Sequence, residues 1–468
     1  MADNSTDYIS TRGNADALDF AGVTLTGLAS DGGLYVPRHW PRFTTEQIES
    51  MRGLPYAELA ARVMAPFTQG VLSETELKDL CAAAYGRFSH AAVTPLIQLD
   101  GQNWLLELFH GPTLAFKDVA LQLLGHLFEC FLTGTDKKLT IVGATSGDTG
   151  SAAIDAVAGR EQIEIFMIHP HERVSDVQRR QMTTILTPNV HNIAIQGSFD
   201  DAQAMVKRMF SDREVNGPLT LSAVNSINWA RLMAQVVYYF YAALRLGAPE
   251  RAVAFSVPTG NFGDVFAGYV AAQMGLPVER LIVATNVNDI LHRALSRGDY
   301  SVLGVTPTAA PSMDIQVSSN FERLLFDLEG RDGSTTGARM KWFEQMGKMV
   351  LSADMRKRAS LMVSARADAD EMALAMRWAY ESCNEVIDPH TAIALHAARA
   401  AKISPGVPVV TLATAHPAKF PDAVERATGV RPPLPTRVAS LFDREERFDV
   451  LPGSYEAVRD YVLANAVR

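Results

Sequence analysis

An alternation of short apolar runs with longer amphipathic segments, which starts near residue 138, constrains the fold more than any other feature of the sequence. The apolar runs are Leu139–Val142, Ile163–Ile168, Asn192–Ile195, Leu219–Ala223, Val253–Val257, Leu281–Thr285 and Val409–Thr414, and helical patterns lie near 149–158, 175–187, 200–211, 227–246, 264–274 and 390–402. Strands that alternate with helices imply parallel β-sheets covered by helices on both faces. Ligands of such sheets bind at the carboxyl ends of strands, so we search the loops that follow them.

The same pattern divides the chain into units. We expect an N-terminal domain at residues 1–95, a larger unit made of 96–135 and 223–468, and a smaller α/β unit at 136–222. Residues 330–349 carry three glycines and predict a surface insertion, and the proline-rich stretch 431–436 predicts a stiff connector.

The sequence indicates three helix starts, two of which carry a capping-box signature. Thr44 precedes a helical pattern, and Ser73 is followed three residues later by Glu76, which together form a capping box. Ser175 and Gln178 have the same spacing. We therefore expect helices to begin directly after Thr44, Ser73 and Ser175.

The composition excludes several classes of protein. Of the 468 residues, 47% are hydrophobic and 20% charged, as in ordinary globular proteins, and the net charge of −9 argues against a general nucleic-acid binder. The three cysteines form no CxxC pair, which argues against a disulfide framework and a structural zinc site. Residues 1–13 lack the apolar core of a signal peptide, and the most apolar helical stretch, Val236–Leu244, is too short to span a membrane. We expect a soluble cytoplasmic protein without a bound metal.

The first glycine-rich loop follows Leu139–Val142. Residues 143–150 read Gly-Ala-Thr-Ser-Gly-Asp-Thr-Gly and lead into a helix. Small residues let the backbone approach a ligand, and free N–H groups at a helix start favour an anion. The glycine spacing is neither that of a dinucleotide fingerprint nor that of a P-loop. An anion or carboxylate cradle is therefore favoured over a simple tight turn.

The second glycine-rich loop follows Val253–Val257. Residues 258–264 read Pro-Thr-Gly-Asn-Phe-Gly-Asp and again precede a helix, which suits a phosphate. Two such loops in one chain indicate a ligand with two anionic groups, or a phosphorylated cofactor beside an anionic substrate.

Lys117 has unusually apolar neighbours, among them Phe116 and Val119. Most lysines are solvated, but desolvation lowers the pKa of a lysine and makes its neutral amine available as a nucleophile or base. An amine together with two anion cradles is the equipment that a pyridoxal phosphate enzyme requires.

Seven segments, in order along the chain, resemble the threonine synthase family, in particular the longer subclass of many bacteria and fungi. They are residues 8–13, 27–35, 110–118, 143–150, 225–231, 259–264 and 414–420. The resemblance covers essentially the whole chain. It implies a tryptophan-synthase-β-like fold (pyridoxal-phosphate fold type II): an α/β protein of two parallel-rich sheets covered by helices, with an extra N-terminal domain.

The resemblance also implies an activity and a cofactor. The family are pyridoxal 5'-phosphate lyases that convert O-phospho-L-homoserine and water to L-threonine and phosphate, the last step of threonine biosynthesis. Lys117 matches the Schiff-base lysine, which would remove protons from Cα and then Cβ of the substrate. Thr414 matches the hydroxyl residue facing the pyridine nitrogen. Residues matching the cup for the cofactor phosphate are Gly260, Asn261, Phe262, Gly263 and Asp264.

Two further groups match substrate-binding positions of the family. The loop that receives the substrate carboxylate corresponds to Thr145, Ser146, Gly147, Asp148 and Thr149, and the residues around the substrate phosphate correspond to Ser226, Asn228 and Arg231. The shorter subclass carries Asn where this chain has Asp148, beside the phenolic oxygen of the cofactor. Because a carboxylate repels a phenolate, we do not expect Asp148 to play the Asn role directly. We expect no nucleic-acid or membrane partner, and a monomer or homodimer.

Several residues have two interpretations at this stage. Arg179 and Arg180 could reach a substrate phosphate or form a solvated helix face. His416 could serve the site or be structural, Asp388 could cap a helix, and His169 is read as a loop residue at a strand end.

Other functions compete with the leading one. A serine or threonine dehydratase, or a phospholyase acting on other phosphorylated amino acids, would share the fold, but Ser226 with Arg231 favours a phosphorylated substrate. A non-catalytic or nucleotide-binding α/β protein is the alternative from another class. The missing Walker lysine and the presence of Lys117 count against it.

Overall fold

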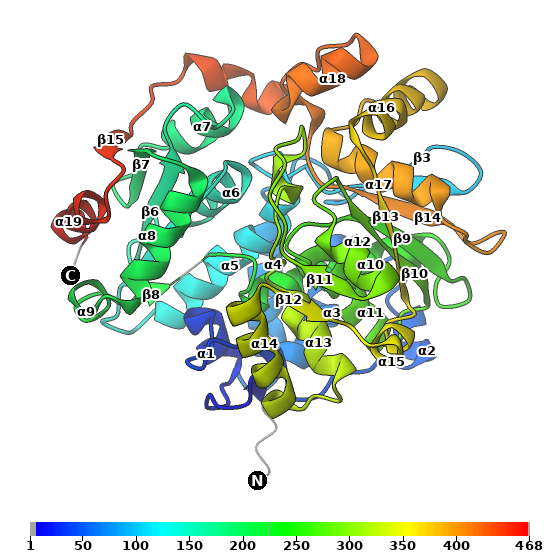
Figure 1. Ribbon diagram of the computed structural model, residues 1–468, viewed down its shortest axis with the longest axis horizontal. Coiled ribbons are helices and arrows are strands. Elements are labelled where there is room, and N and C mark those ends of the chain that lie inside the picture. Colours follow the sequence, from blue (N-terminus) through cyan, green and yellow to red (C-terminus); the bar gives the residue numbers. More distant parts are fainter. Residues whose placement is uncertain (1–5, 223, 467–468) are drawn as a thin grey trace.

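The computed structural model describes residues 6–222 and 224–466, and shows two parallel-rich sheets with helices packed around them (Figure 1). Ala223, the last residue of one predicted run, and residues 1–5 of the N-terminal segment lie outside the described residues. The predicted α/β architecture with two sheets is confirmed.

The larger sheet has six strands in the order β13-β10-β9-β14-β4-β3, and all neighbours are parallel except β3 and β4. The strands are β3 (Leu96–Gln98), β4 (Asn103–Glu107), β9 (Val253–Pro258), β10 (Val278–Thr285), β13 (Met362–Arg366) and β14 (Val409–Ala413). Helix α17 (Pro389–Ala400) packs on one face, where Ile393 and Ala397 join Ala254 and Ile282 in an apolar cluster. The other face packs on the main core, to which α10 (Trp229–Arg245) and α11 (Gly263–Gln273) contribute.

The smaller sheet has five strands, all parallel, in the order β15-β7-β6-β5-β8. They are β5 (Leu139–Ala144), β6 (Ile163–Pro170), β7 (Val190–Gln196), β8 (Leu221–Ser222) and β15 (Asp449–Pro452). Helices α6 (Asp148–Val157) and α7 (Asp176–Thr183) cover one face; α8 (Phe199–Ser211) and α19 (Tyr455–Asn465) share an apolar cluster on the other.

The C-terminal segment corrects the expected boundaries. The prediction that residues 223–468 all belong to the larger unit is wrong for β15 and α19, because β15 pairs with β7 and Val458 and Val462 are buried in the core of the smaller sheet. An exposed amphipathic helix near the end of a chain gives no local sign of which sheet it will cover.

The N-terminal segment has no core of its own. Strands β1 (Tyr8–Ser10) and β2 (Tyr35–Pro37) pair antiparallel, with α1 (Phe20–Thr26) between them in the chain. Helices α2 (Thr45–Glu49), α3 (Tyr56–Thr68) and α4 (Glu74–Tyr85) follow. Their apolar residues join the same core as α5 (Lys117–Leu132) and α10. The buried guanidinium of Arg323 donates to the Tyr35 and Ile227 carbonyls, which ties β2 to the segment before α10.

The remaining elements lie around the two sheets. They are α9 (Arg213–Asn216), α12 (Ile290–Arg297), β11 (Asp299–Ser301), η1 (Pro311–Met313), α13 (Phe321–Leu328), α14 (Gly333–Met346), β12 (Lys348–Val350), α15 (Ala353–Arg358), α16 (Ala369–Cys383), η2 (Pro417–Lys419), α18 (Pro421–Thr428) and η3 (Thr436–Asp443). The segment 330–349 is at the surface, as predicted, but it is folded into α14 and β12. Over residues 6–222 and 224–466, no helix is long and apolar enough to cross a membrane.

One of the two predicted capping boxes, that of Ser73, forms in full. The helix start predicted after Thr44 also carries a reciprocal capping box, which was not predicted. Ser175 accepts from the Gln178 N–H, but the Gln178 side chain amide donates instead to Asp148, 2.8 Å away. The side chain that would complete this cap is used between the two sheets, at the place described next.

Candidate active site

Lys117 is the first residue of α5, and the strand β14 lies beside it. The Phe116 N–H donates to the Thr414 carbonyl at 2.8 Å, and Ala115 forms a β-bridge with Ala415. Leu114, just before, has a positive φ of 65°, which turns the chain into the helix. These contacts bring Thr414 next to Lys117, as the sequence predicts for a lysine and a hydroxyl that serve one ligand.

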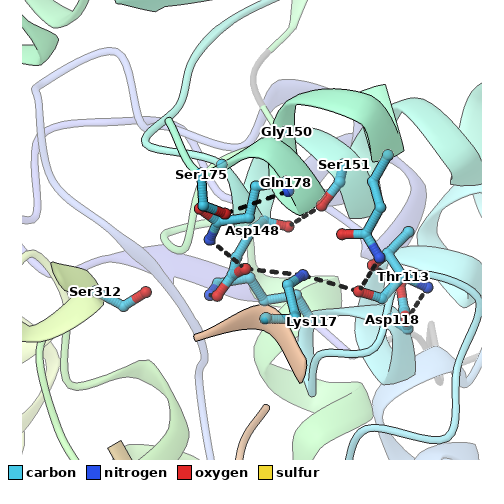
Figure 2. Close-up of polar contacts among 12 residues, drawn as sticks. Thr113, Lys117, Asp118, Asp148, Gly150, Ser151, Ser175, Gln178 and Ser312 are labelled. Carbon is cyan, nitrogen blue, oxygen red and sulfur yellow. Dashed lines mark hydrogen bonds and ion pairs between the residues drawn. The ribbon is translucent and has the colours of Figure 1, made fainter. Parts of the chain in front are cut away.

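Asp148, the first residue of α6, is the centre of a buried polar cluster. Its Oδ2 lies 3.2 Å from the Lys117 Nζ, and its Oδ1 accepts from the Lys419 Nζ and the Gln178 Nε2 at 2.8 Å each. Figure 2 shows Lys117, Asp148 and Gln178 pointing toward one another from α5, α6 and α7. Burial alone would raise the pKa of Asp148, but the two ammonium groups hold it well below its usual value. Asp148 is therefore a carboxylate.

The environment of Lys117 favours its neutral amine. The side chain is buried, and this burial is the largest cause of its lowered pKa. The positive charges of Lys419 and Arg231 lower the pKa further, while Asp148 opposes them. The amine that the sequence singled out is thus available as a nucleophile or base.

The loop 143–150 has the build of an anion cradle. The Thr145 Oγ1 accepts from the N–H groups of Gly147 and Gly150 at 2.9 Å each, which curls the loop. Gly147 has a φ of 136°, and a Cβ there would lie 2.5 Å from the Gln178 side chain. Among the described residues, no acceptor takes the N–H groups of Ser146, Asp148 and Thr149. The start of α6 therefore offers free donors beside Lys117.

The loop 259–263 has the same build at the start of α11. A Cβ on Gly260 would lie 2.6 Å from the Ser312 carbonyl oxygen, and Phe262 adopts a left-handed φ of 64°. The N–H groups of residues 260–263 meet no acceptor in the described part of the chain, whereas the carbonyls of Gly260 and Asn261 are held by Ser318 and Asn320. Hydrogen bonds to its carbonyl groups thus hold the loop in place, while its N–H groups stay free to bind a ligand.

The side chain of Asp264 points away from this cradle. Its Oδ1 accepts from the Tyr238 and Tyr239 hydroxyls of α10 at 2.5 and 2.9 Å. Burial raises the pKa of Asp264 to about 6, despite these hydrogen bonds. The main-chain N–H of Asp264 is left to serve the cup in which the resemblance places it, while its Oδ2 has no hydrogen-bond partner among the described residues.

Arg231, in the first turn of α10, is a buried cation. It is 4% exposed, its Nη1 donates to the Val224 carbonyl, and its Nε has no hydrogen-bond partner. None of the carboxylates in residues 6–222 and 224–466 forms an ion pair with it, and burial lowers its pKa to about 10. A buried arginine near Lys117 without a counter-ion is a binding position for an anion.

The other two residues predicted around a phosphate differ in placement. The Ser226 hydroxyl is part-buried, 3.0 Å from that of Ser319. Asn228 is fully buried and caps α10: its Oδ1 accepts from the Ala230 N–H, and its Nδ2 donates to the Thr24 carbonyl. The structure does not bring the Asn228 side chain into the cluster, since both ends of its amide hold the fold.

For other residues with two interpretations, the structure shows contacts that stabilise the fold. Arg179 and Arg180 both pair with Glu446, so they hold the C-terminal segment to α7. His416 caps η2, and Asp388 caps α17. The reading of His169 as a loop residue is wrong, because it is a buried residue within β6 that pairs with Ala194 of β7.

Sequence reasoning missed three members of the cluster. Lys419 lay in a motif already noted after β14, and Gln178 lay in a capping signature that predicted a different bond. Thr113 donates to Asp118 through its N–H and its hydroxyl, while its carbonyl accepts from Lys419 and Gln181. Buried partners that meet across two sheets leave no spacing pattern along the chain.

The site fits the phosphorylated aldehyde cofactor that the sequence resemblance implies. Lys117 supplies an amine of lowered pKa, and the loop 260–263 presents free N–H groups at a helix start. Gly260 packs too closely on the Ser312 carbonyl to carry a side chain, which holds this loop in place. No group of His, Cys, Asp and Glu side chains in the described ranges could hold a metal ion.

Three sequence families match successive parts of the chain. Residues 7–85 match the family described as threonine synthase N terminus, residues 88–415 the pyridoxal-phosphate dependent enzymes, and residues 391–462 the family described as threonine synthase, C-terminal. The second match alone spans more than half of the chain.

Similar proteins agree with these families over the full length. A threonine synthase from Pseudomonas aeruginosa is 56% identical over 463 residues, with 98% of this chain and 99% of that protein covered. The crystal structure of a PLP-bound threonine synthase from Brucella melitensis has a TM-score of 0.96 at 52% identity, covering 98% of this chain and 99% of that one. The structure of a yeast threonine synthase has a TM-score of 0.93 at 37% identity, covering 99% of both chains.

Proposed function

Because the chain belongs to the threonine synthase family of pyridoxal-phosphate-dependent lyases, we propose that it converts O-phospho-L-homoserine and water into L-threonine and phosphate through the residues gathered around Lys117. The observation that carries the choice of substrate is Arg231, a buried cation beside Lys117 with no carboxylate partner among the described residues. A phosphate dianion would supply the missing counter-ion.

The residues around the cofactor have separate roles in this proposal. Bound through its aldehyde, pyridoxal phosphate acts as an electron sink for the substrate Cα. The free N–H groups of loop 260–263 would hold its phosphate, and Thr414 would offer its hydroxyl to the ring nitrogen. Because a hydroxyl is not a carboxylate, Thr414 does not keep that nitrogen protonated.

Lys117 moves the protons. When its amine is neutral, it removes the Cα proton and then a Cβ proton of the substrate, which allows the γ-phosphate to leave. The free N–H groups at the start of α6 hold the substrate carboxylate, and Arg231 with Ser226 stabilises the departing phosphate. A proton is then returned to Cγ, water adds at Cβ with loss of one of its protons, and a second proton is returned to Cα, which together give L-threonine.

We propose further that the smaller unit, residues 136–222 together with β15 and α19, closes over the ligand and excludes water until water is needed. The support is that Gln178 and Gln181 of α7 bond to Asp148 and to the Thr113 carbonyl at the junction of the sheets. Structures of the protein with and without a substrate analogue that show the same angle between the sheets would contradict closure.

The setting is also a proposal. We place the enzyme in the cytoplasm as a monomer or homodimer that acts on a small molecule, with no nucleic-acid or membrane partner. The support for a reducing compartment is that Cys81, Cys130 and Cys383 are all free thiols in the structure.

The test of the cofactor is the visible spectrum of the purified protein before and after borohydride reduction, with peptide mapping of the reduced adduct. We expect a yellow chromophore fixed on Lys117, and Lys117→Ala should lose both the chromophore and all turnover. A protein that stays colourless with added pyridoxal phosphate contradicts the proposal.

The test of the substrate compares phosphate or product release from O-phosphohomoserine, O-phosphoserine and threonine. Arg231→Met should lower kcat/KM for O-phosphohomoserine about 100-fold, about 3 kcal/mol, because a charge-assisted bond to the phosphate is lost. The exposed Lys402→Met variant serves as a control of unchanged activity. A variant at Arg231 with normal kcat/KM, or a wild type that prefers threonine, would favour a dehydratase instead.

A further inference from the structure

A second buried lysine shares the carboxylate of the reactive one. Lys419, at the end of η2, is 0% exposed, and its Nζ lies 2.8 Å from the Asp148 Oδ1 and 2.8 Å from the Thr113 carbonyl oxygen. The Nζ of Lys117 is 3.2 Å from the other oxygen of Asp148. A fully buried lysine needs a counter-ion, and Asp148 is the carboxylate that contacts it.

The position of Lys419 is fixed by its surroundings. The Thr113 carbonyl that it contacts also accepts from the Gln181 Nε2 at 3.0 Å, and Thr113 itself is held by Asp118. The charged and titratable groups that face Lys419 are Asp148, Asp118, Lys117 and His416. The ammonium group therefore stays in contact with Asp148 when other partners of that carboxylate change.

One carboxylate cannot neutralise two ammonium groups. The charged groups that face Lys117 are Asp148 from α6, Lys419 from η2, Arg231 from α10 and Asp264 from α11. With one oxygen of Asp148 held by Lys419, a protonated Lys117 would share its nearest carboxylate and lie near the positive charges of Lys419 and Arg231 in a buried site. Loss of the Lys117 proton to solvent removes this repulsion.

We propose that Lys419 is a positioning residue for the reaction: it takes Asp148 as its counter-ion, and so leaves Lys117 as the neutral amine that the cofactor and the substrate require. This inference rests on the proposed function, in which Lys117 is the reactive amine. It gives the shared carboxylate a use other than the Asn role of the shorter subclass, since Asp148 here balances a lysine that never reacts.

The experiment reads the proton state of Lys117 directly. Protein freed of cofactor is acetylated with a trace of acetic anhydride over a range of pH, and the rate at Lys117 is measured by peptide mapping. We expect Lys419→Met to raise the pH of half-maximal rate by about 1 unit, because Asp148 then serves Lys117 alone. Below both midpoints the rate at Lys117 should fall about tenfold.

Three further variants separate charge from packing. Lys419→Gln is also neutral but keeps a donor for the Thr113 carbonyl, so it should fold and give the same upward shift as Lys419→Met. Lys419→Arg should keep the wild-type midpoint, and the exposed Lys402→Met should leave it unchanged. Unfolding temperatures of all samples identify any variant that fails to fold.

Two outcomes overturn the inference. One is a folded Lys419→Gln or Lys419→Met protein with the wild-type midpoint. The other is an equal shift in Lys419→Arg, which would mean that packing and not charge matters. The borohydride mapping of the wild type keeps the two proposals apart: a cofactor fixed on another residue refutes the proposed function, whereas a cofactor on Lys117 with no shift refutes only the role of Lys419.

Discussion

Two strand–loop–helix units of the molecule have the same backbone arrangement, but the pKa of the carboxyl group at the helix start is shifted in opposite directions. In one, β5 leads through a glycine-rich loop to Gly147 and Asp148 at the start of α6; in the other, β9 leads to Gly263 and Asp264 at the start of α11. Both carboxylates are buried and feel the charge of Lys117. Yet the pKa of Asp148 lies well below its usual value, whereas that of Asp264 is raised to about 6.

The difference comes from side chains that other elements contribute. Burial raises the pKa of both groups, but Asp148 contacts two ammonium groups and an amide, while the donors to Asp264 are the hydroxyls of Tyr238 and Tyr239. Two neutral donors do not offset the cost of a buried charge here, and two cations do. The backbone position at a helix start therefore does not decide the charge.

Removal of Asp148 should have the largest effect. Asp148→Asn leaves the ammonium group of Lys419 buried without a counter-ion, so we expect the free energy of unfolding at pH 7 to fall by about 3–5 kcal/mol in urea titrations. Because the folded pKa of Asp148 is depressed, its contribution is present above the unfolded pKa and is lost as the pH falls through the folded pKa. The difference in the free energy of unfolding between the wild type and Asp148→Asn should therefore become smaller in strong acid.

The control for Asp148 is the exposed Asp176→Asn, which removes a surface ion pair with Arg179 and should change stability by less than about 0.5 kcal/mol. An Asp148→Asn protein as stable as the wild type at pH 7 would mean that Lys419 does not need Asp148 as its counter-ion.

Removal of Asp264 should give a pH dependence of the opposite sign. Its folded pKa is raised, so its contribution is fully present below the unfolded pKa of about 3.9 and is lost as the pH rises through about 6. Relative to Asp264→Asn, the wild type should lose up to about 3 kcal/mol between about pH 4 and pH 7. Urea unfolding of both proteins at a series of pH values measures this loss, and a constant difference would contradict it.

The smallest effect is expected from a single hydroxyl. Tyr238→Phe removes one of the two hydrogen bonds that lower the pKa of Asp264, so the pKa of Asp264 should be higher in the variant than in the wild type. The pH range over which Asp264 reduces stability should therefore lie higher in the variant, and its free energy of unfolding at pH 7 should be lower by about 1 kcal/mol. The matched control is Tyr461→Phe, which removes an exposed hydrogen bond to Asp449. Identical pH profiles for Tyr238→Phe and the wild type would show that Tyr239 alone sets the state of Asp264.

Much of the fold and the reactive lysine could be predicted from local patterns. The apolar runs that became β5, β6, β7, β9, β10 and β14 are each continuous in sequence, because a strand buried on both faces needs apolar side chains throughout. Lys117 was identified by its apolar neighbours, and the two loops by small residues before a helix. All of these signals lie within a few residues of the feature that they predict.

The rest depends on contacts between distant segments. Lys419 lies near Asp148 because Ala115 and Ala415 form a bridge beside β14. Gln178 reaches Asp148 because α7 packs against α6. The direction of the Asp264 side chain is set by two tyrosines of α10. These contacts do not follow from any spacing along the chain. The sequence therefore showed which residue types are present but not which residues they contact.

The pairing of β15 with β7 has a consequence for synthesis. Until the last segment of the chain has been made, β7 is an edge strand with unpaired backbone groups, and the apolar face that Val458 and Val462 cover is open to water. The smaller sheet is therefore completed by the end of the chain, after the larger sheet has all of its strands. A chain whose synthesis stops before β15 would contain Lys117 and both glycine-rich loops. Its smaller sheet would nevertheless expose the unpaired edge of β7, which favours aggregation.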